Sequence, residues 1–382
     1  MADAKNPVGQ AENKSKVYFM DFRIADVNTD NIPSKLRRLM KKGGFEDLPF
    51  GGRFAALKLH FGEPGNLTYL RPNYARVVAS YVRELGGMPF VTDCNTLYIG
   101  RRKNALDHLD AAYENGFNPF ALGCHTIIAD GLKGTDEVAV PVPGGKYVKE
   151  AKIGRAIMDA DIVISMTHFK VHELVGIGGV LKNVGMGCGS RAGKREMHSS
   201  GKPQVRQDVC VGCGFCAKNC AHGAISRGPN GKMSIDESKC AGCGRCIGAC
   251  FKDAVETKYD EAIDVAGRKI VEYAMAVLHG RPQFHLNFAV DIIPLCDCHD
   301  SNDIPIVADI GIFASTDPVA ADKAVADAVN ARPVQAGSYL DGVKSCGDYF
   351  KDIHSHVNWL PMLEYAEELG LGHVGYDIVK VD

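Results

Sequence analysis

The sequence CVGCGFCAKNC at residues 210–220 is followed by CAGCGRCIGAC at residues 240–250. Both stretches space their cysteines as C-x2-C-x2-C-x3-C. A run of this kind gives three thiolates to one [4Fe–4S] cluster and its fourth thiolate to another. The spacing therefore predicts two [4Fe–4S] clusters with crosswise ligands. The first cluster is expected on Cys210, Cys213, Cys216 and Cys250, and the second on Cys240, Cys243, Cys246 and Cys220.

Glycines inside both runs, such as Gly212 and Gly242, permit tight loops and leave backbone amides free to donate to cluster sulfurs. A zinc ribbon is one alternative, but zinc sites are usually built from separate C-x2-C pairs. A disulfide framework is another, and it does not suit a long chain without a secretory signal. The runs resemble those of bacterial two-cluster ferredoxins, except that Ala221 and Phe251 stand where those proteins usually carry proline.

The length of the chain, 382 residues, allows two or three domains. Its 44 Lys and Arg nearly balance 46 Asp and Glu, so no overall field attracts nucleic acid or a membrane surface. No apolar run is long enough to cross a bilayer, and residues 1–16 lack the apolar stretch of a signal peptide. Cubane clusters and six further thiols suit a reducing compartment. We therefore expect a cytoplasmic protein with no nucleic-acid or membrane partner.

Strand and helix patterns alternate on both sides of the cysteine runs, which predicts an α/β fold with a largely parallel sheet and helices on both faces. Strands are expected at 16–22, 54–59, 89–92, 126–128, 138–142, 162–166, 287–293, 306–309, 312–314 and 376–381. Helices are expected at 31–42, 73–85, 104–115, 151–160, 258–279, 317–329, 341–354 and 361–369.

The cysteine runs interrupt this pattern rather than follow it. The predicted division is a loose tail at 1–16, an α/β part at 17–202, a ferredoxin-like two-cluster insert at 203–257, and a second α/β part at 258–382. An insert is tolerated where both of its ends leave the host close together. The clusters are therefore expected beside residues 190–203 and 257–260.

A second site is expected at the carboxyl ends of the strands, where open α/β sheets bind their ligands. Ionisable side chains crowd these ends: Lys58, His60, Glu63, Asp93, Cys94, His168, Lys170, His172, Asp291, Cys296, Cys298, His299 and Asp309. Such groups are costly unless paired, hydrated or ligated, so their concentration predicts a functional cleft. For any single histidine, the simpler interpretation is a hydrogen-bonded loop residue.

The segment 170–198 combines glycines with basic side chains, which suits a bound anion. The residues expected to bind an anionic cofactor are Lys182, Asn183, Arg191 and Lys194. It is not a Walker A loop, because Gly193-Lys194 is followed by Arg195, and the looser dinucleotide pattern at 187–192 has no strand leading into it. The alternative is a solvated loop that leads to the insert.

Cys296-x-Cys298-His299 offers soft metal ligands at short spacing but is incomplete, because a closed site needs four donors. The residues that could complete it are His168, His172, Cys188 and Cys94. The alternative is a set of reduced, buried or redox-active thiols.

The chain also resembles the family called domain of unknown function 362, often labelled uncharacterized Fe-S center protein. The resemblance covers most of residues 50–330. It rests on Lys170-Val171-His172, on Lys182-Asn183 with Gly185 and His198, and on Asp317-Pro318-Val319-Ala320-Ala321-Asp322. It implies an α/β host and cytoplasmic redox work, without a settled reaction.

Two main functional hypotheses follow. In the first, the protein is a ferredoxin-linked reductase whose clusters relay electrons to an anionic substrate or cofactor in the cleft. Lys170 would then help to bind the anion, and His60, His172 or His198 would deliver protons. In the second, it is a non-catalytic electron carrier or a docking module for a partner redox protein. Handling of metal or Fe–S cargo at Cys296, Cys298 and His299 is a weaker third. Flavin binding and the oligomeric state are not decided by the sequence.

Overall fold

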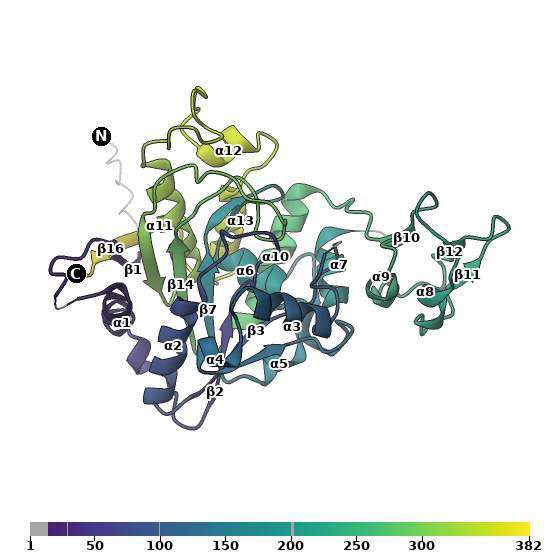
Figure 1. Ribbon diagram of the computed structural model, residues 1–382, viewed down its shortest axis with the longest axis horizontal. Coiled ribbons are helices and arrows are strands. Elements are labelled where there is room, and N and C mark those ends of the chain that lie inside the picture. The colour runs from purple at the N-terminus through teal and green to yellow at the C-terminus, as the bar shows by residue number, and fades with distance from the viewer. Residues whose placement is uncertain (1–13, 29, 99, 200–201) are drawn as a thin grey trace, which may run out of the picture.

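An eight-stranded sheet forms the centre of the computed structural model, which describes residues 14–28, 30–98, 100–199 and 202–382 (Figure 1). The strand order is β16-β1-β15-β14-β7-β2-β3-β4, and β15 runs antiparallel to both of its neighbours while the other pairs are parallel. The strands are β1 Ser15–Met20, β2 Phe54–Lys58, β3 Met88–Asp93, β4 His125–Ile128, β7 Ile162–His168, β14 Gln283–Ala289, β15 Gly311–Ser315 and β16 Tyr376–Lys380. The predicted α/β fold with a largely parallel sheet is confirmed.

Helices cover both faces of this sheet, and each face has its own hydrophobic core. Alternation along β7 supplies the two cores, because Ile162 and Ile164 point into one and Val163 into the other. The helices of the first face are α1 Ile32–Lys42, α2 Pro72–Glu84, α3 Ala105–Glu114 and α4 Pro119–Leu122. Those of the second are α6 Val180–Cys188, α10 Ile263–Leu278, α11 Pro318–Asn330, α12 Tyr349–Ile353 and α13 Leu360–Glu368. Within the ranges described, no helix is both long and apolar enough to cross a membrane.

Several expected elements differ from those observed. The helix expected at 151–160 is the strand β6 (Glu150–Gly154) followed by the short α5 (Arg155–Asp159). The reason is that β6 pairs with β5 (Glu137–Pro141) and buries alternate residues, a tertiary contact that local helix propensity does not reveal. The strand expected at 306–309 reduces to one bridge between Val307 and Val334, and the helix expected at 341–354 forms only α12. The expected tail at 1–16 lies largely outside the described residues, but its last two residues already belong to β1.

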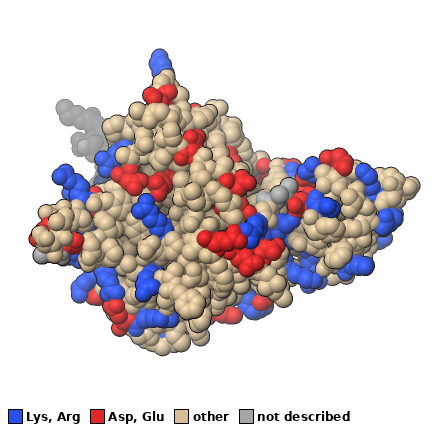
Figure 2. Space-filling view, viewed as in Figure 1, with Lys and Arg blue, Asp and Glu red and all other residues tan. Residues whose placement is uncertain are grey.

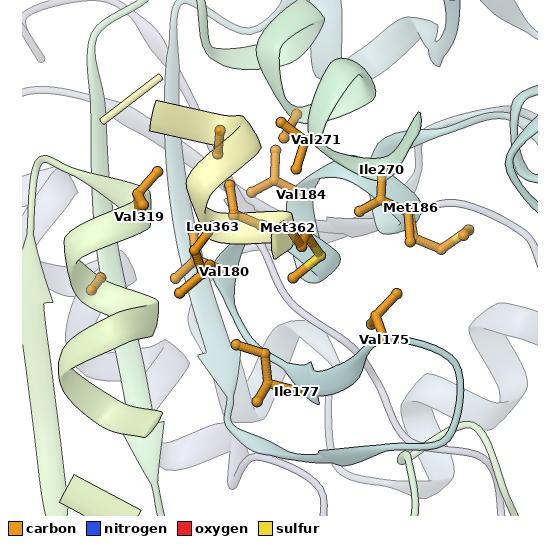
Figure 3. Close-up of a cluster of buried hydrophobic side chains, with 14 of the residues drawn as sticks. Val175, Ile177, Val180, Val184, Met186, Ile270, Val271, Val319, Met362 and Leu363 are labelled. Carbon is orange, nitrogen blue, oxygen red and sulfur yellow. The ribbon is translucent and has the colours of Figure 1, made fainter. Parts of the chain in front are cut away.

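The glycine-rich segment is the largest correction, because it is not an open loop. A hairpin of β8 (Lys170–His172) and β9 (Gly176–Gly178) leads into α6 and then α7 (Arg191–His198). The glycines mark close packing instead: a Cβ added at Gly185 would lie 2.1 Å from the Ile270 carbonyl oxygen on α10. Figure 3 shows Val184 and Met186 of α6 facing Ile270 and Val271 of α10.

This packing gives a stability prediction. Gly185→Ala is expected to lower the free energy of unfolding by about 1–3 kcal/mol or more, because the added methyl overpacks the α6–α10 contact. Gly267→Ala on α10 is the matched control, since its added Cβ would meet no atom closer than 3.8 Å, and it should be neutral or stabilising by up to about 1 kcal/mol. Thermal unfolding of both variants measures the difference. Equal effects would contradict the close contact at Gly185.

Residues 203–257 project from the side of the sheet body, beyond α7 (Figure 1). Their elements are β10 Gln204–Val205, α8 Phe215–Lys218, β11 Ile225–Arg227, β12 Met233–Ile235, α9 Arg245–Ala249 and β13 Val255–Glu256. β10 pairs antiparallel with β13, so both ends of the segment meet at the host. Leu97, from the loop after β3, is buried in the same small core as Cys216 and Cys246, which fixes the segment against the body.

Candidate functional site

A cavity of about 570 Å³ lies at the carboxyl ends of β2, β3 and β7. The host lines it with residues that follow these strands, such as His60, Cys94 and His172. The projecting segment lines the same cavity through Ile247, Asp253, Val255 and Glu256, and Tyr259, just after the segment, lines it too. Most of the ionisable residues expected at strand ends line this cavity. Those outside the lining are Glu63, His168, Asp291, Cys296 and Asp309. The cavity is therefore formed jointly by the sheet body and the cysteine-rich segment.

Internal ion pairs neutralise several of these charges. Lys58, at the end of β2, lies 3.0 Å from the Asp93 carboxylate at the end of β3. Lys58 also donates to the Asn183 side-chain oxygen over 2.8 Å, while Asn183 Nδ2 donates to Thr167 Oγ1 over 2.9 Å. Because both ends of the Asn183 amide are engaged within the protein, this residue holds α6 on the strand ends. It has little capacity left for the cofactor expected from the sequence.

Lys170 is paired in a similar way. Its Nζ lies 2.8 Å from Asp297 Oδ2, and the same carboxylate is 2.9 Å from His168 Nδ1. Burial alone would raise the pKa of Asp297, but the charges of His168 and Lys170 hold this pKa below its usual value. Asp297 lies between the two cysteines of the Cys296-x-Cys298 motif, and sequence reasoning missed it because that motif drew attention to sulfur. The anion-binding charge expected at Lys170 is already balanced by this carboxylate.

Arg102 is a second charged residue at the cavity that the sequence did not reveal. It is fully buried, donates to Glu63 over 2.7 Å and to Tyr98 OH over 2.8 Å, and lies 2.9 Å from His60 Nε2. Burial, and after it the charge of Arg102, holds the pKa of His60 well below its usual value. His60 is therefore uncharged near neutral pH. No periodic pattern surrounds Arg102, so its burial could not be predicted.

The other two histidines expected to move protons also line the cavity. Burial, and after it the charges of Lys182 and His172, lower the pKa of His198 to about 3, so His198 is neutral near pH 7. Its ring contacts the Tyr259 ring edge-on. His172 Nδ1 accepts the Leu174 amide over 3.1 Å, which places the proton of the neutral ring on Nε2. Of the three histidines, His172 presents the clearest proton donor.

Cys296 is a buried sulfur behind the cavity wall. The Lys182 ammonium lies 3.3 Å from its Sγ. Hydrogen bonding with Cys298, aided by the charges of Lys182 and His172, holds the pKa of the Cys296 thiol well below its usual value. Burial opposes the charged form of Lys182, yet the neighbouring Cys296 sulfur keeps its pKa above the usual value. The arrangement is that of a thiolate beside an ammonium group.

Lys194 and Arg191, both on α7, take different directions. Lys194 lines the cavity and donates to the Gly187 carbonyl over 3.2 Å. Arg191 is fully buried against α9, where a Cβ added at Gly248 would lie 1.8 Å from its Nη1. Within the part of the chain that the structure describes, Arg191 Nε and Nη1 have no hydrogen-bond partner. Arg191 thus faces the cysteine-rich segment and not the cavity.

The eight cysteines of that segment gather in two groups. Burial is the main cause that raises the pKa of Cys216. The neighbouring groups that raise it further are Cys250, Cys210 and Cys213. A separate small cavity is lined by Cys220, Cys240, Cys243 and Cys246. The crosswise ligand sets expected from the spacing stay a prediction.

Backbone amides donate to several of these sulfurs, as expected from the glycine-containing loops. The Gly212 amide lies 3.4 Å from Cys210 Sγ, and the Gly242 amide lies 3.4 Å from Cys240 Sγ. Ala254 donates to Cys250 Sγ over 3.2 Å. The thiol ligands and these amide donors fit the chemistry of [4Fe–4S] clusters, whose potentials respond to hydrogen bonds of this kind.

Fold and site together define an α/β protein in which a cysteine-rich segment and the strand ends of the host line one cavity, with both ionisable and apolar side chains in its wall. The chain belongs to the family described as Domain of unknown function (DUF362), whose family model matches residues 55–327. The resemblance to this family inferred from the sequence is confirmed.

Individual relatives are distant. A thylakoid-associated protein of Synechocystis sp. is 26% identical over 177 residues, which cover 44% of this chain and 49% of that protein. The chain thus spans about half the length of this curated relative. Among solved structures, the lactate racemase apoprotein of Thermoanaerobacterium thermosaccharolyticum is 10% identical to this chain, with a TM-score of 0.38. The match covers 72% of this chain and 51% of the racemase chain. A Thermotoga maritima protein is 14% identical with a TM-score of 0.33, covering 68% and 51%. Neither structural likeness is close enough to bear on function.

Proposed function

We propose that the protein is a cytoplasmic iron–sulfur redox protein in which two [4Fe–4S] clusters relay electrons to an anionic substrate or cofactor in the cavity. Residues 203–257 would be the ferredoxin-like domain that holds the clusters. One observation supports this most strongly: Leu97 and Ile247 belong both to the cavity lining and to the core around the cysteines. The electron donor and the substrate would therefore meet across a single layer of side chains.

The cysteine sulfurs and the amides that donate to them would hold the clusters and set their potentials. When bound, the clusters supply one-electron transfer. The buried Arg191 guanidinium would add a positive charge beside the cluster on Cys220, Cys240, Cys243 and Cys246. Burial lowers the pKa of Arg191, but a guanidinium stays protonated in proteins. Among the residues that the structure describes, Arg191 Nε and Nη1 have no hydrogen-bond partner, and Arg191 packs against α9, which supports a role toward this cluster.

Several cations line the cavity, and of these Lys182 and Lys194 donate to a sulfur and to a backbone carbonyl rather than to a carboxylate, so they are the ones expected to face a bound ligand. The Lys182 ammonium would orient an anionic group, and His172 would supply a proton through Nε2. Lys170, His60 and Asn183 would act indirectly, by keeping Asp297, Arg102 and α6 in place. A flavin or another anionic cofactor in this cavity would meet the same side chains.

Reoxidation of the reduced protein by small anionic oxidants tests this function. The rate for the wild-type protein is expected to saturate with oxidant concentration, because the oxidant must bind in the cavity. Lys182→Met is expected to slow it by about 10–100-fold, corresponding to the roughly 1.5–3 kcal/mol of a hydrogen bond to a charged group, while the cluster absorbance stays unchanged. Lys218→Met, a change on the projecting segment, is the control. Linear, Lys182-independent reoxidation would contradict a cavity substrate and favour a simple carrier.

The alternative, a carrier or docking module for a redox protein, is favoured by one surface feature. Phe215 and Phe251 are 51% and 60% exposed, and their rings lie 5.9 Å apart. Lys218 and Lys252 lie over these rings, and Figure 2 shows Lys and Arg along the lower edge of the projecting lobe. An apolar patch with basic neighbours suits an acidic redox partner.

This alternative predicts that the double variant Phe215→Ser, Phe251→Ser is reduced at least about 10-fold more slowly by an acidic ferredoxin, because the apolar contact area of the patch is lost. Reduction by dithionite should be unchanged. Tyr339→Ser, which removes an aromatic ring 55% exposed elsewhere on the chain, is the control. Unaltered rates with the ferredoxin would place the docking surface on another face.

A further inference from the structure

A second group of metal-ligand side chains lies on the cavity wall, outside the eight clustered cysteines. Glu173, Cys298 and His299 each offer one donor atom, and these three atoms lie within 4.8 Å of one another. Glu173 Oε1 and His299 Nε2 are 3.0 Å apart. All three residues line the cavity. We propose that they bind one zinc-class divalent cation, with an open coordination position facing the cavity.

The fold brings these donors together from distant parts of the chain. Glu173 lies in the turn of the β8–β9 hairpin, directly after His172, and Cys298 and His299 follow β14. The backbone here is held firmly, because the Val171 amide donates to the Ile293 carbonyl and the His299 amide to the Cys296 carbonyl. The hairpin and the loop after β14 are thus fixed to one another. A donor set on such anchored segments needs only side-chain adjustment to close on an ion.

The donor chemistry selects the class of metal. One thiolate, one imidazole and one carboxylate suit zinc or a similar borderline cation, whereas calcium and magnesium prefer oxygen ligands alone. Bond lengths of about 2.0–2.3 Å place tetrahedral ligand atoms roughly 3.3–3.7 Å apart, so atoms already within 4.8 Å need small rotations. Two anionic ligands would balance the charge of the ion. Three protein ligands with a fourth position open is the arrangement of catalytic zinc sites.

The neighbouring groups explain why the other candidates are not ligands. His168 has both ring nitrogens engaged, by Asp297 and by the Val290 carbonyl. His172 already accepts the Leu174 amide at Nδ1 over 3.1 Å, so this nitrogen is not free for a metal ion. The cation Lys182, which lines the same cavity, is compensated by Cys296, whose Sγ lies 3.3 Å from its ammonium group.

Two further thiols are excluded by their position. Cys94 and Cys188 are buried beside one another, where the Cys94 thiol donates to the Cys188 carbonyl. Glu173 is therefore the donor that completes the Cys298-His299 pair. An ion held by these three ligands would act as a Lewis acid toward an anion in the cavity. The proposal does not depend on electron transfer.

Zinc binding to the full-length, cluster-loaded protein tests the proposal. The protein is dialysed anaerobically against buffered free Zn²⁺, and bound zinc and iron are measured by elemental mass spectrometry. About one zinc ion per chain is expected, with the iron content unchanged. Cys298→Ser and His299→Gln should each weaken zinc binding by at least about 100-fold, since even indirect ligand contacts are worth 10–100-fold.

Matched controls separate the site from general effects. Cys346→Ser removes an exposed cysteine, and His373→Gln removes a histidine that pairs with Glu367 over 3.5 Å as His299 pairs with Glu173. Both should bind zinc normally. The His299 side chain is 43% exposed, so its variant keeps the core intact, and an unchanged iron content checks this.

Three results would overturn the proposal. The first is absence of zinc binding at saturating free Zn²⁺, and the second is undiminished binding in the Cys298 and His299 variants. The third is zinc uptake that is matched by iron loss. A fourth outcome would replace the metal site by a redox-active thiol pair. In it, the wild-type protein binds no zinc, loses the mass of two hydrogens on mild oxidation, and yields a peptide in which Cys296 and Cys298 are joined by a disulfide. A normal reoxidation assay together with no zinc would leave the proposed electron relay intact.

Discussion

Cys250→Ser is expected to remove about half of the iron from the protein, four of about eight atoms, although Cys250 lies in the second cysteine run. The reason is that Cys250 gathers with the first-run cysteines, as the neighbours of Cys216 indicate. A [4Fe–4S] cluster that loses one thiolate ligand on a partly exposed segment is expected to be lost during purification. Iron and acid-labile sulfide, measured per chain under anaerobic conditions, give the count.

Two double variants decide which cysteines share a cluster. Cys210→Ser with Cys250→Ser should lose no more iron than either single change, because both residues serve one cluster. Cys246→Ser with Cys250→Ser should lose nearly all of it, because each change removes a different cluster. The opposite pattern would mean that each run binds its own metal and that the crosswise assignment is wrong. Cys346→Ser, an exposed thiol outside the segment, is the control and should keep all of the iron.

Arg191→Gln is expected to lower the reduction potential of one cluster and to leave the other nearly unchanged. A positive charge about 10 Å from an added electron stabilises it by about 1.7 kcal/mol at an effective dielectric constant of about 20, or roughly 70 mV for a one-electron step. The affected cluster should be the one on Cys220, Cys240, Cys243 and Cys246, since Arg191 packs on Gly248 of α9 and on Gly244, which caps α9. Potentials are measured by redox titration followed by electron paramagnetic resonance.

Two comparisons make this result interpretable. Arg227→Gln removes an exposed arginine of the same segment that donates to the Gly231 carbonyl, and it should shift either potential much less. Arg191→Lys keeps the charge and should restore most of the wild-type value. Equal potentials in the wild-type and Arg191→Gln proteins would show that Arg191 only fills space between α7 and α9.

The fold was predictable from the sequence where the signals are local. Alternating apolar strands and capped amphipathic helices placed β1 to β4, α1 to α3 and α11 within a few residues. The prediction failed at Gly185 and Gly193, because a glycine that lets two helices approach looks the same in sequence as a glycine in a loop. It also failed at β6, whose strand conformation depends on pairing with β5.

The candidate site was predictable in position more than in detail. Residues at strand ends, such as His60, Lys170 and His172, do meet in one cavity, since parallel strands bring their carboxyl ends to one edge. Which charges remain free was not predictable, because the partners Asp297 and Glu63 come from loops without a pattern. Glu173 was missed for the same reason. Its role depends on a hairpin that the glycine-rich sequence concealed.

The most direct test of the central claim is the iron and sulfide content of the anaerobically purified wild-type protein, combined with its paramagnetic spectrum after reduction. Two [4Fe–4S] clusters predict about eight iron and eight sulfide atoms per chain, with signals from two neighbouring reduced clusters. Zinc in place of iron, or iron without sulfide, would contradict it.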